Sequence, residues 1–93
     1  MEFEWDEAKN ASDIEKHGLA FEKALIIFED ERRFTIEDVR FKYDEHRFTV
    51  FGSIRERLHL VVFVKRGEII RIISARKANK REQKKHGYRS IQV

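Results

Sequence analysis

The sequence predicts an α+β fold in which two N-terminal helices, an antiparallel sheet of about four strands and a C-terminal helix form one domain, residues 1–93. Three patterns predict this fold. Apolar residues recur at helical spacing before residue 30, and they alternate with a period of two from residue 33 onward. A charged segment without a helix breaker then runs from residue 77 to 86. A chain of 93 residues has room for one hydrophobic core.

The first third of the chain predicts two helices after a short edge strand, FEW. In residues 6–18, DEAKNASDIEKHG, Asp6 can cap the helix N-terminus and Gly18 can adopt the left-handed conformation that ends a helix. Residues 21–28, FEKALIIF, place apolar side chains three and four positions apart, which indicates a second, short helix.

Alternating apolar residues then predict strands, with the helices expected on one side of the sheet. The predicted strands are residues 33–39, 47–54, 58–64 and 69–75. Gly67 stands where a tight turn needs positive φ, so the last two strands should form a hairpin.

The two faces of this hairpin differ in character. Pairing of Val64 with Ile69 would give one face the residues Leu58, Leu60, Val62, Val64, Ile69, Arg71, Ile73 and Ala75. We expect this face to pack under the helices. Arg71 does not fit on a buried face. Either Arg71 lies near an edge of the sheet, or a bulge after Gly67 exchanges the two faces. Alternation alone leaves both possibilities open.

The two halves of the chain carry opposite charge. Residues 1–46 hold 7 Lys or Arg and 14 Asp or Glu, a balance of −7, whereas residues 47–93 hold 13 and 3, a balance of +10. A basic half of this size attracts a polyanion, most commonly nucleic acid. The alternative is that folding mixes the halves and cancels the field.

Several arginines could bind phosphate, because a planar guanidinium donates two parallel hydrogen bonds to it. The candidates are Arg47, Arg71, Arg76 and Arg81. Alternatively, each arginine stem covers apolar surface while its charged end stays in water. Proton transfer near neutral pH could involve His46, His59 or His86, although a lone histidine is more often structural. Glu45, close to Arg47, could accept a proton or form an ordinary surface ion pair.

Other chemistries have no support in the composition. The chain contains no cysteine, no histidine pair at metal-ligand spacing and no Gly-rich phosphate loop. We therefore expect no metal and no cofactor. No apolar run approaches the roughly 20 residues that span a bilayer, so we expect a cytoplasmic protein with no membrane contact.

Four motifs resemble the BrnT toxins of type II toxin–antitoxin systems. They are FEWDEAK, the KHG that precedes FEKA, GSIRERLHLVVFV and RIISARKANKREQ. The most specific is RIISAR followed by an A-x-x-R-E helix start. The matching positions are Trp5, Asp6, Lys9, Lys16, His17, Gly18, Phe21, Ala24, Glu45, Arg47, Gly52, Arg71, Ser74, Arg76, Ala78, Arg81 and Glu82. Two positions depart from the family pattern: Asp13 replaces an asparagine, and His86 replaces a tyrosine, with Tyr88 two residues on.

This resemblance implies a RelE-like fold and a metal-independent ribonuclease that arrests translation. It also implies a BrnA-like antitoxin, which neutralises the toxin and together with it binds operator DNA. For this activity we assign Arg47, Arg71 and Arg76 to phosphate binding and transition-state stabilisation. Proton transfer is assigned to Glu45 or His86, with His59 in reserve. Lys77, Lys80, Arg81 and Lys84 would bind RNA. The alternative is a non-catalytic module that binds nucleic acid or a protein partner.

Overall fold

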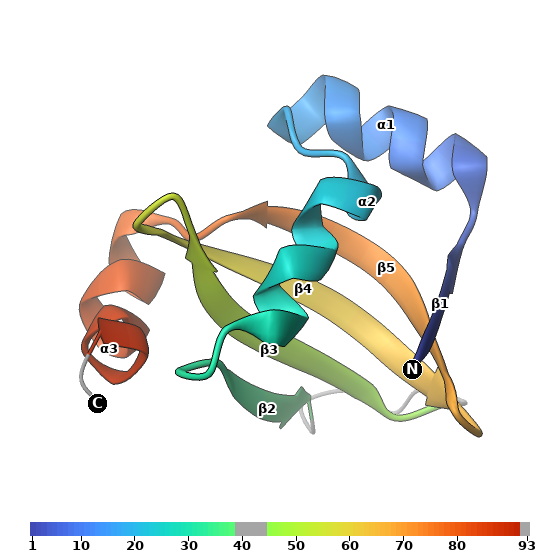
Figure 1. The fold of residues 1–93 in the computed structure, drawn as a ribbon. Helices are drawn as coiled ribbons and strands as arrows, with labels where there is room; N and C mark the ends of the chain where they lie inside the picture. Colours follow the sequence, from blue (N-terminus) through green and yellow to red (C-terminus); the bar gives the residue numbers. More distant parts are fainter. Residues whose placement is uncertain (39–44, 92–93) are drawn as a thin grey trace.

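The computed structural model describes residues 1–38 and 45–91, and it describes side chains up to His86. The elements in chain order are β1 (Glu2–Trp5), α1 (Glu7–His17), α2 (Phe21–Ala24), the 3₁₀ helix η1 (Leu25–Glu29), β2 (Phe34–Asp38), β3 (Arg47–Ile54), β4 (Arg57–Arg66), β5 (Ile69–Lys77) and α3 (Lys80–Ile91). The described strands form one sheet in the order β1-β5-β4-β3-β2, which curves beneath the N-terminal helices (Figure 1).

The predicted α+β class is confirmed, but the sheet differs in detail. It is mixed and has five strands in the described part of the chain, because β1 adds to β5 in parallel orientation. The remaining neighbours are antiparallel, including the predicted hairpin of β4 and β5. The predicted end of β2 at Val39 lies outside the described residues.

The first helix begins and ends where the sequence predicts. Asp6 accepts hydrogen bonds from the backbone N–H groups of Ala8 and Lys9, which satisfies two of the donors left open at a helix start. Gly18 adopts φ 71° and its N–H binds the carbonyl oxygen of Ile14. The predicted second helix over residues 21–28 is a single α-helical turn, α2, that tightens into η1.

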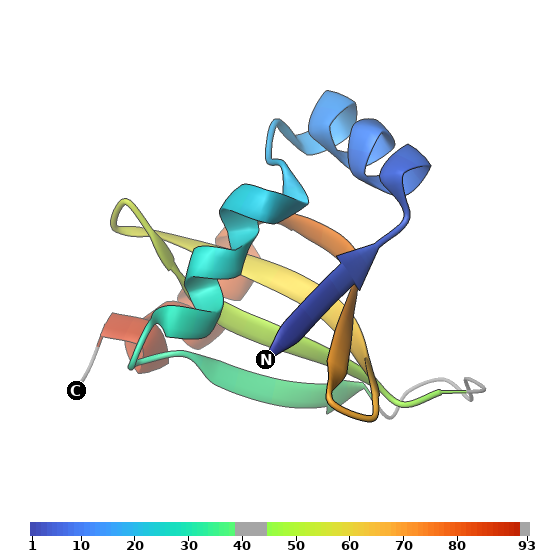
Figure 2. The same ribbon diagram turned by 45° about the vertical axis from the view of Figure 1, so that its right-hand side comes forward.

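The expectation that all helices lie on one side of the sheet was wrong. α1, α2 and η1 cover one face, whereas α3 lies against the other, as the turned view shows (Figure 2). α3 runs over Lys80–Ile91, so it begins later than the predicted residue 77 and continues through Gly87. Ala78 explains the change of face, because it is buried against Leu58 and Leu60 just before the helix begins.

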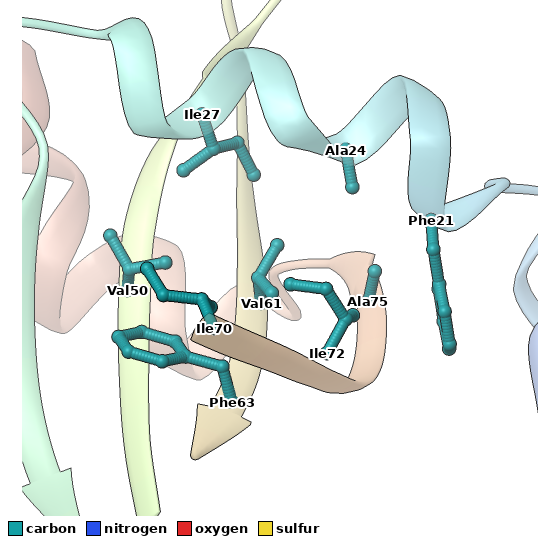
Figure 3. Close-up of a cluster of buried hydrophobic side chains, with 9 residues drawn as sticks. All are labelled: Phe21, Ala24, Ile27, Val50, Val61, Phe63, Ile70, Ile72 and Ala75. Carbon is teal, nitrogen blue, oxygen red and sulfur yellow. The ribbon is translucent and has the colours of Figure 1, made fainter. Parts of the chain in front are cut away.

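The larger core lies between the sheet and the N-terminal helices. Phe21, Ala24 and Ile27 point from α2 and η1 toward the strands (Figure 3). The strand residues of this core are Val50, Val61, Phe63, Ile70, Ile72 and Ala75. A smaller cluster on the opposite face, under α3, contains Phe51, Leu58, Leu60 and Ala78.

These two clusters correct the predicted faces of the hairpin. Leu58, Leu60 and Val62 face α3, and Val61 and Phe63 face the N-terminal helices. The turn is tighter than predicted, with Arg66 opposite Ile69 and Val64 opposite Arg71.

A bulge is present in β5, but not after Gly67. The register shifts between Val62 and Phe63, where β5 carries one extra residue, Ile73. Ile72 and Ala75 therefore face the same core although they are three residues apart. For the same reason Arg71 and Arg76, five residues apart, are both on the face turned toward α3.

Candidate active site

The candidate site is a groove between α3 and the part of the sheet that α3 leaves uncovered. Its volume is about 590 Å³. It is lined by Ile36, Glu37, Asp38, Arg47, Thr49, Phe51, Leu60, Val62, Ile73, Ser74, Arg76, Glu82, Lys85 and His86. An apolar floor from the central strands is thus bordered by charged side chains from β2, β3, β5 and α3. The charged residues are balanced, with Glu37, Asp38 and Glu82 beside Arg47, Arg76 and Lys85.

Arg76 lies where β5 meets α3 and forms a bidentate ion pair with Glu82. Its Nη1 and Nη2 donate to the carboxylate of Glu82 at 2.7 and 2.9 Å, and Nη1 also reaches the carbonyl oxygen of Lys77 at 3.2 Å. The hydrogen bonds with Glu82 raise the pKa of Arg76 and lower the pKa of Glu82. Both groups are therefore charged at neutral pH, and the guanidinium is held beside the groove.

Glu82 also caps α3. The backbone N–H of Asn79 donates to Glu82 Oε1 at 2.9 Å, and the backbone N–H of Glu82 donates to Asn79 Oδ1 at 2.8 Å. This reciprocal pair is a capping box, here with asparagine in the first position. One carboxylate therefore fixes both the start of α3 and the orientation of Arg76.

Lys85 and His86 follow Glu82 by three and four residues, so all three lie on the groove side of α3. The His86 side chain is buried. Its ring contacts Phe51 and Phe34, with centroid separations of 4.6 and 5.4 Å. His86 thus anchors α3 on the sheet while it lines the groove.

The predicted catalytic residues fall into two groups. Arg47, Arg76 and His86 line the groove, whereas Glu45 and Arg71 lie outside the lining. Arg71 forms an ion pair with Glu4 of β1. Strand pairing nevertheless places it in one row with Arg47, on either side of Val64.

Glu45 lies near the turn end of the hairpin. Its carboxylate accepts two hydrogen bonds from Arg66, both at 2.9 Å. These bonds lower the pKa of Glu45. Glu45 is therefore an ionised partner of Arg66 at neutral pH and does not line the groove.

The predicted RNA-binding residues Lys77, Lys80, Arg81 and Lys84 are all exposed at the end of β5 and on α3. His59 is buried away from the groove lining, and its Nδ1 lies 2.7 Å from the carbonyl oxygen of Arg57. Burial lowers the pKa of His59.

Several residues that shape the site were not predicted from the sequence. Glu82, Lys85, Thr49 and Ser74 line the groove but were not predicted as site residues. The motif Asn79-x-x-Glu82 is itself a capping signal. Placing the helix start there would have aligned Glu82, Lys85 and His86 on one face.

Within residues 1–38 and 45–91, no group of three or more His, Cys, Asp and Glu side chains is placed to hold a metal ion. The same stretch contains no helix that is both long enough and apolar enough to cross a membrane.

Residues 5–82 match the family model described as the ribonuclease toxin BrnT of type II toxin–antitoxin systems. A comparison with curated proteins found no match. The matched segment extends from β1 to the first turn of α3 and includes every groove residue except Lys85 and His86.

Proposed function

The chain belongs to the BrnT family of ribonuclease toxins of type II toxin–antitoxin systems, and on this premise we propose that it cleaves RNA without a metal ion in the groove beside α3. One observation supports this location above others: Arg47, Arg76, Lys85 and His86 line the same groove. The cations can bind phosphate oxygens, and the apolar floor offers surface to unstacked bases.

RNA supplies its own nucleophile, which limits what the protein must do. The 2′-hydroxyl loses its proton and attacks the adjacent phosphorus, and the bond to the 5′-oxygen breaks. The products are a 2′,3′-cyclic phosphate and a free 5′-hydroxyl. The protein must orient the phosphate, stabilise the charge that builds on its oxygens and move two protons. Neither a covalent intermediate nor a metal ion is required.

Arg76 is the proposed donor to the developing phosphorane. A guanidinium has five N–H donors, and the described hydrogen bonds to Glu82 and Lys77 occupy three of them. The fixed fork therefore presents charge to the groove with little reorganisation. Arg47 would contact the RNA backbone at the opposite end of the groove, and Arg71 would extend this contact along the same row.

His86 is the proposed proton carrier, with Glu45 as the alternative. His86 borders the groove with Arg76, whereas Glu45 is paired with Arg66 outside it. His86→Phe separates the two roles of this histidine, because phenylalanine can keep the aromatic contact with Phe51 but cannot transfer a proton. We expect His86→Phe to fold and to lose cleavage.

In the decisive experiment, the purified protein is incubated with a short single-stranded RNA in the presence of EDTA, which removes divalent ions. We expect cleavage that leaves a cyclic phosphate, and no cleavage of the same strand with 2′-deoxy nucleotides. Loss of activity on chelation, with recovery on adding a divalent ion, would refute the metal-free mechanism. Binding of RNA without any cleavage would instead favour a non-catalytic nucleic-acid-binding module.

As a type II toxin, the chain has an antitoxin partner. We propose that the partner is a small BrnA-like protein that covers the exposed basic side chains of α3, including Lys80 and Lys84. The pair would then bind operator DNA, and the released toxin would stop translation in the cytoplasm. Induced expression with and without the partner, read out as growth and protein synthesis, tests this part of the proposal.

A further inference from the structure

β5 loses its neighbouring strand partway along its length. β1 pairs with residues Ile69–Ile72, and beyond them the outer edge of β5 lies against α1 (Figure 1). Asp13 of α1 takes the place of the missing strand. Its Oδ2 accepts the backbone N–H of Ala75 at 3.1 Å and the hydroxyl of Ser74 at 3.0 Å. A side-chain carboxylate thus satisfies a backbone donor that a β-ladder would otherwise satisfy.

This carboxylate is buried but remains ionised. Only 2% of Asp13 is exposed. Burial opposes ionisation, yet hydrogen bonds from Lys9, Ala75 and Ser74 outweigh it and lower the pKa of Asp13. Lys9 Nζ lies 2.8 Å from Oδ1, the oxygen that does not contact β5. Oδ1 therefore forms an ion pair within α1, and Oδ2 links α1 to β5.

The link lies directly beside the bulge. The extra residue Ile73 precedes Ser74 and Ala75, and Arg76 follows them. Ala75 is fully buried in the core under the N-terminal helices, so its neighbour Arg76 faces α3. In an unbulged strand Arg76 would instead alternate onto the face with Ile72, away from the groove.

We propose that Asp13 is a positioning residue for Arg76: by holding Ser74 and Ala75, it keeps β5 in the bulged register that turns Arg76 into the groove. The consequence for catalysis rests on the proposed function, whereas the placement of Arg76 does not. Displacement of a charged donor by about 1 Å can reduce a rate by about 10²-fold.

The experiment uses the full chain and three variants. Asp13→Ala removes both acceptors, Asp13→Asn keeps one oxygen for Ala75 and Ser74, and Lys9→Gln removes only the ion pair within α1. Each variant is measured at a temperature where circular dichroism shows it folded. Two quantities are compared, namely kcat and KM for RNA cleavage and the Nε–H resonance of Arg76, which is assigned by its loss in Arg76→Ala.

We expect Asp13→Ala to lower kcat by about 10²-fold, with KM nearly unchanged, and to shift the Arg76 resonance. Asp13→Asn and Lys9→Gln should stay within about threefold of the wild type and keep the resonance in place. An unmoved resonance in Asp13→Ala would overturn the proposal. So would an Asp13→Asn or Lys9→Gln variant as impaired as Asp13→Ala. If the wild type does not cleave RNA at all, the proposed function fails while the resonance still decides the role of Asp13.

Discussion

Replacement of Arg76 by alanine should separate activity from stability. A charged donor aimed at developing charge contributes about 2.7–4 kcal/mol to a transition state. Losing it should lower kcat by about 10²–10³-fold. The ion pair that disappears is only partly shielded, since the side chains of Arg76 and Glu82 are 32% and 20% exposed.

The stability cost should be modest for this reason. Solvent-exposed pairs contribute about 0–1 kcal/mol, and this partly exposed, bidentate pair should lie near or slightly above the upper end of that range. The Glu82 carboxylate also keeps its hydrogen bond from Asn79 and its place at the start of α3, where negative charge is favoured. A loss of about 1 kcal/mol lowers the melting temperature of a domain of this size by about 4–8 °C.

Arg66→Ala is the matched control. Arg66 forms the same two-pronged ion pair, with Glu45, but lies outside the groove lining. Cleavage of a single-stranded RNA and thermal unfolding are measured for both variants. Arg66→Ala should cleave at the wild-type rate. A folded Arg76→Ala variant with kcat within threefold of the wild type would refute the assignment of Arg76 to transition-state stabilisation.

Three further results are expected. Gly52→Ala should lower the free energy of unfolding in urea by about 1–3 kcal/mol. A Cβ at this position would lie 2.7 Å from Cγ2 of the fully buried Ile27. An unchanged free energy of unfolding would mean that η1 can shift away from the new methyl group at little cost. Burial lowers the pKa of His59, so the folded state binds protons less readily than the unfolded chain. The free energy of unfolding should be highest above about pH 6.5 and should decrease as the pH falls below it, and His59→Gln should remove this part of the pH dependence. Association with the antitoxin should slow as salt rises and should slow further in Lys80→Glu/Lys84→Glu; an on-rate insensitive to both changes would place the antitoxin away from α3.

Local signals account for the parts of the fold that were predicted correctly. Asp6 and Gly18 define the ends of α1 through hydrogen bonds to residues within four positions, so their effect is visible in a short window. The alternation in β3 predicted residues 47–54, and these are the bounds that the structure has. The tight turn at Gly67 likewise depends on one residue with positive φ.

Features that depend on distant residues were not predicted. Parallel pairing of β1 with β5 joins residues almost 70 positions apart and has no local signature. The sequence contains one weak signal for the position of α3. β4 is apolar on both faces, which is expected of a strand that is covered from both sides. Reading its alternation as one buried face led to the wrong assignment of the hairpin faces.

The same limit applies to the candidate site. Three of the five residues proposed from the sequence as catalytic, namely Arg47, Arg76 and His86, line the groove. The face of Arg76, however, depends on the bulge at Ile73, which alternation does not indicate. The pairing of Glu45 with Arg66 joins residues 21 positions apart, so it could not be read from sequence spacing either.

The dual attachment of Glu82 couples two equilibria that are usually separate. A phosphate bound to the two remaining donors of Arg76 would share the positive charge of the guanidinium with the Glu82 carboxylate, which also caps α3. Any weakening of the pair therefore changes how firmly the first turn of α3 is capped, and by reciprocity a frayed first turn changes the affinity of Arg76 for phosphate. Phosphate affinity and the order of the first turn of α3 should therefore report the same coupling free energy.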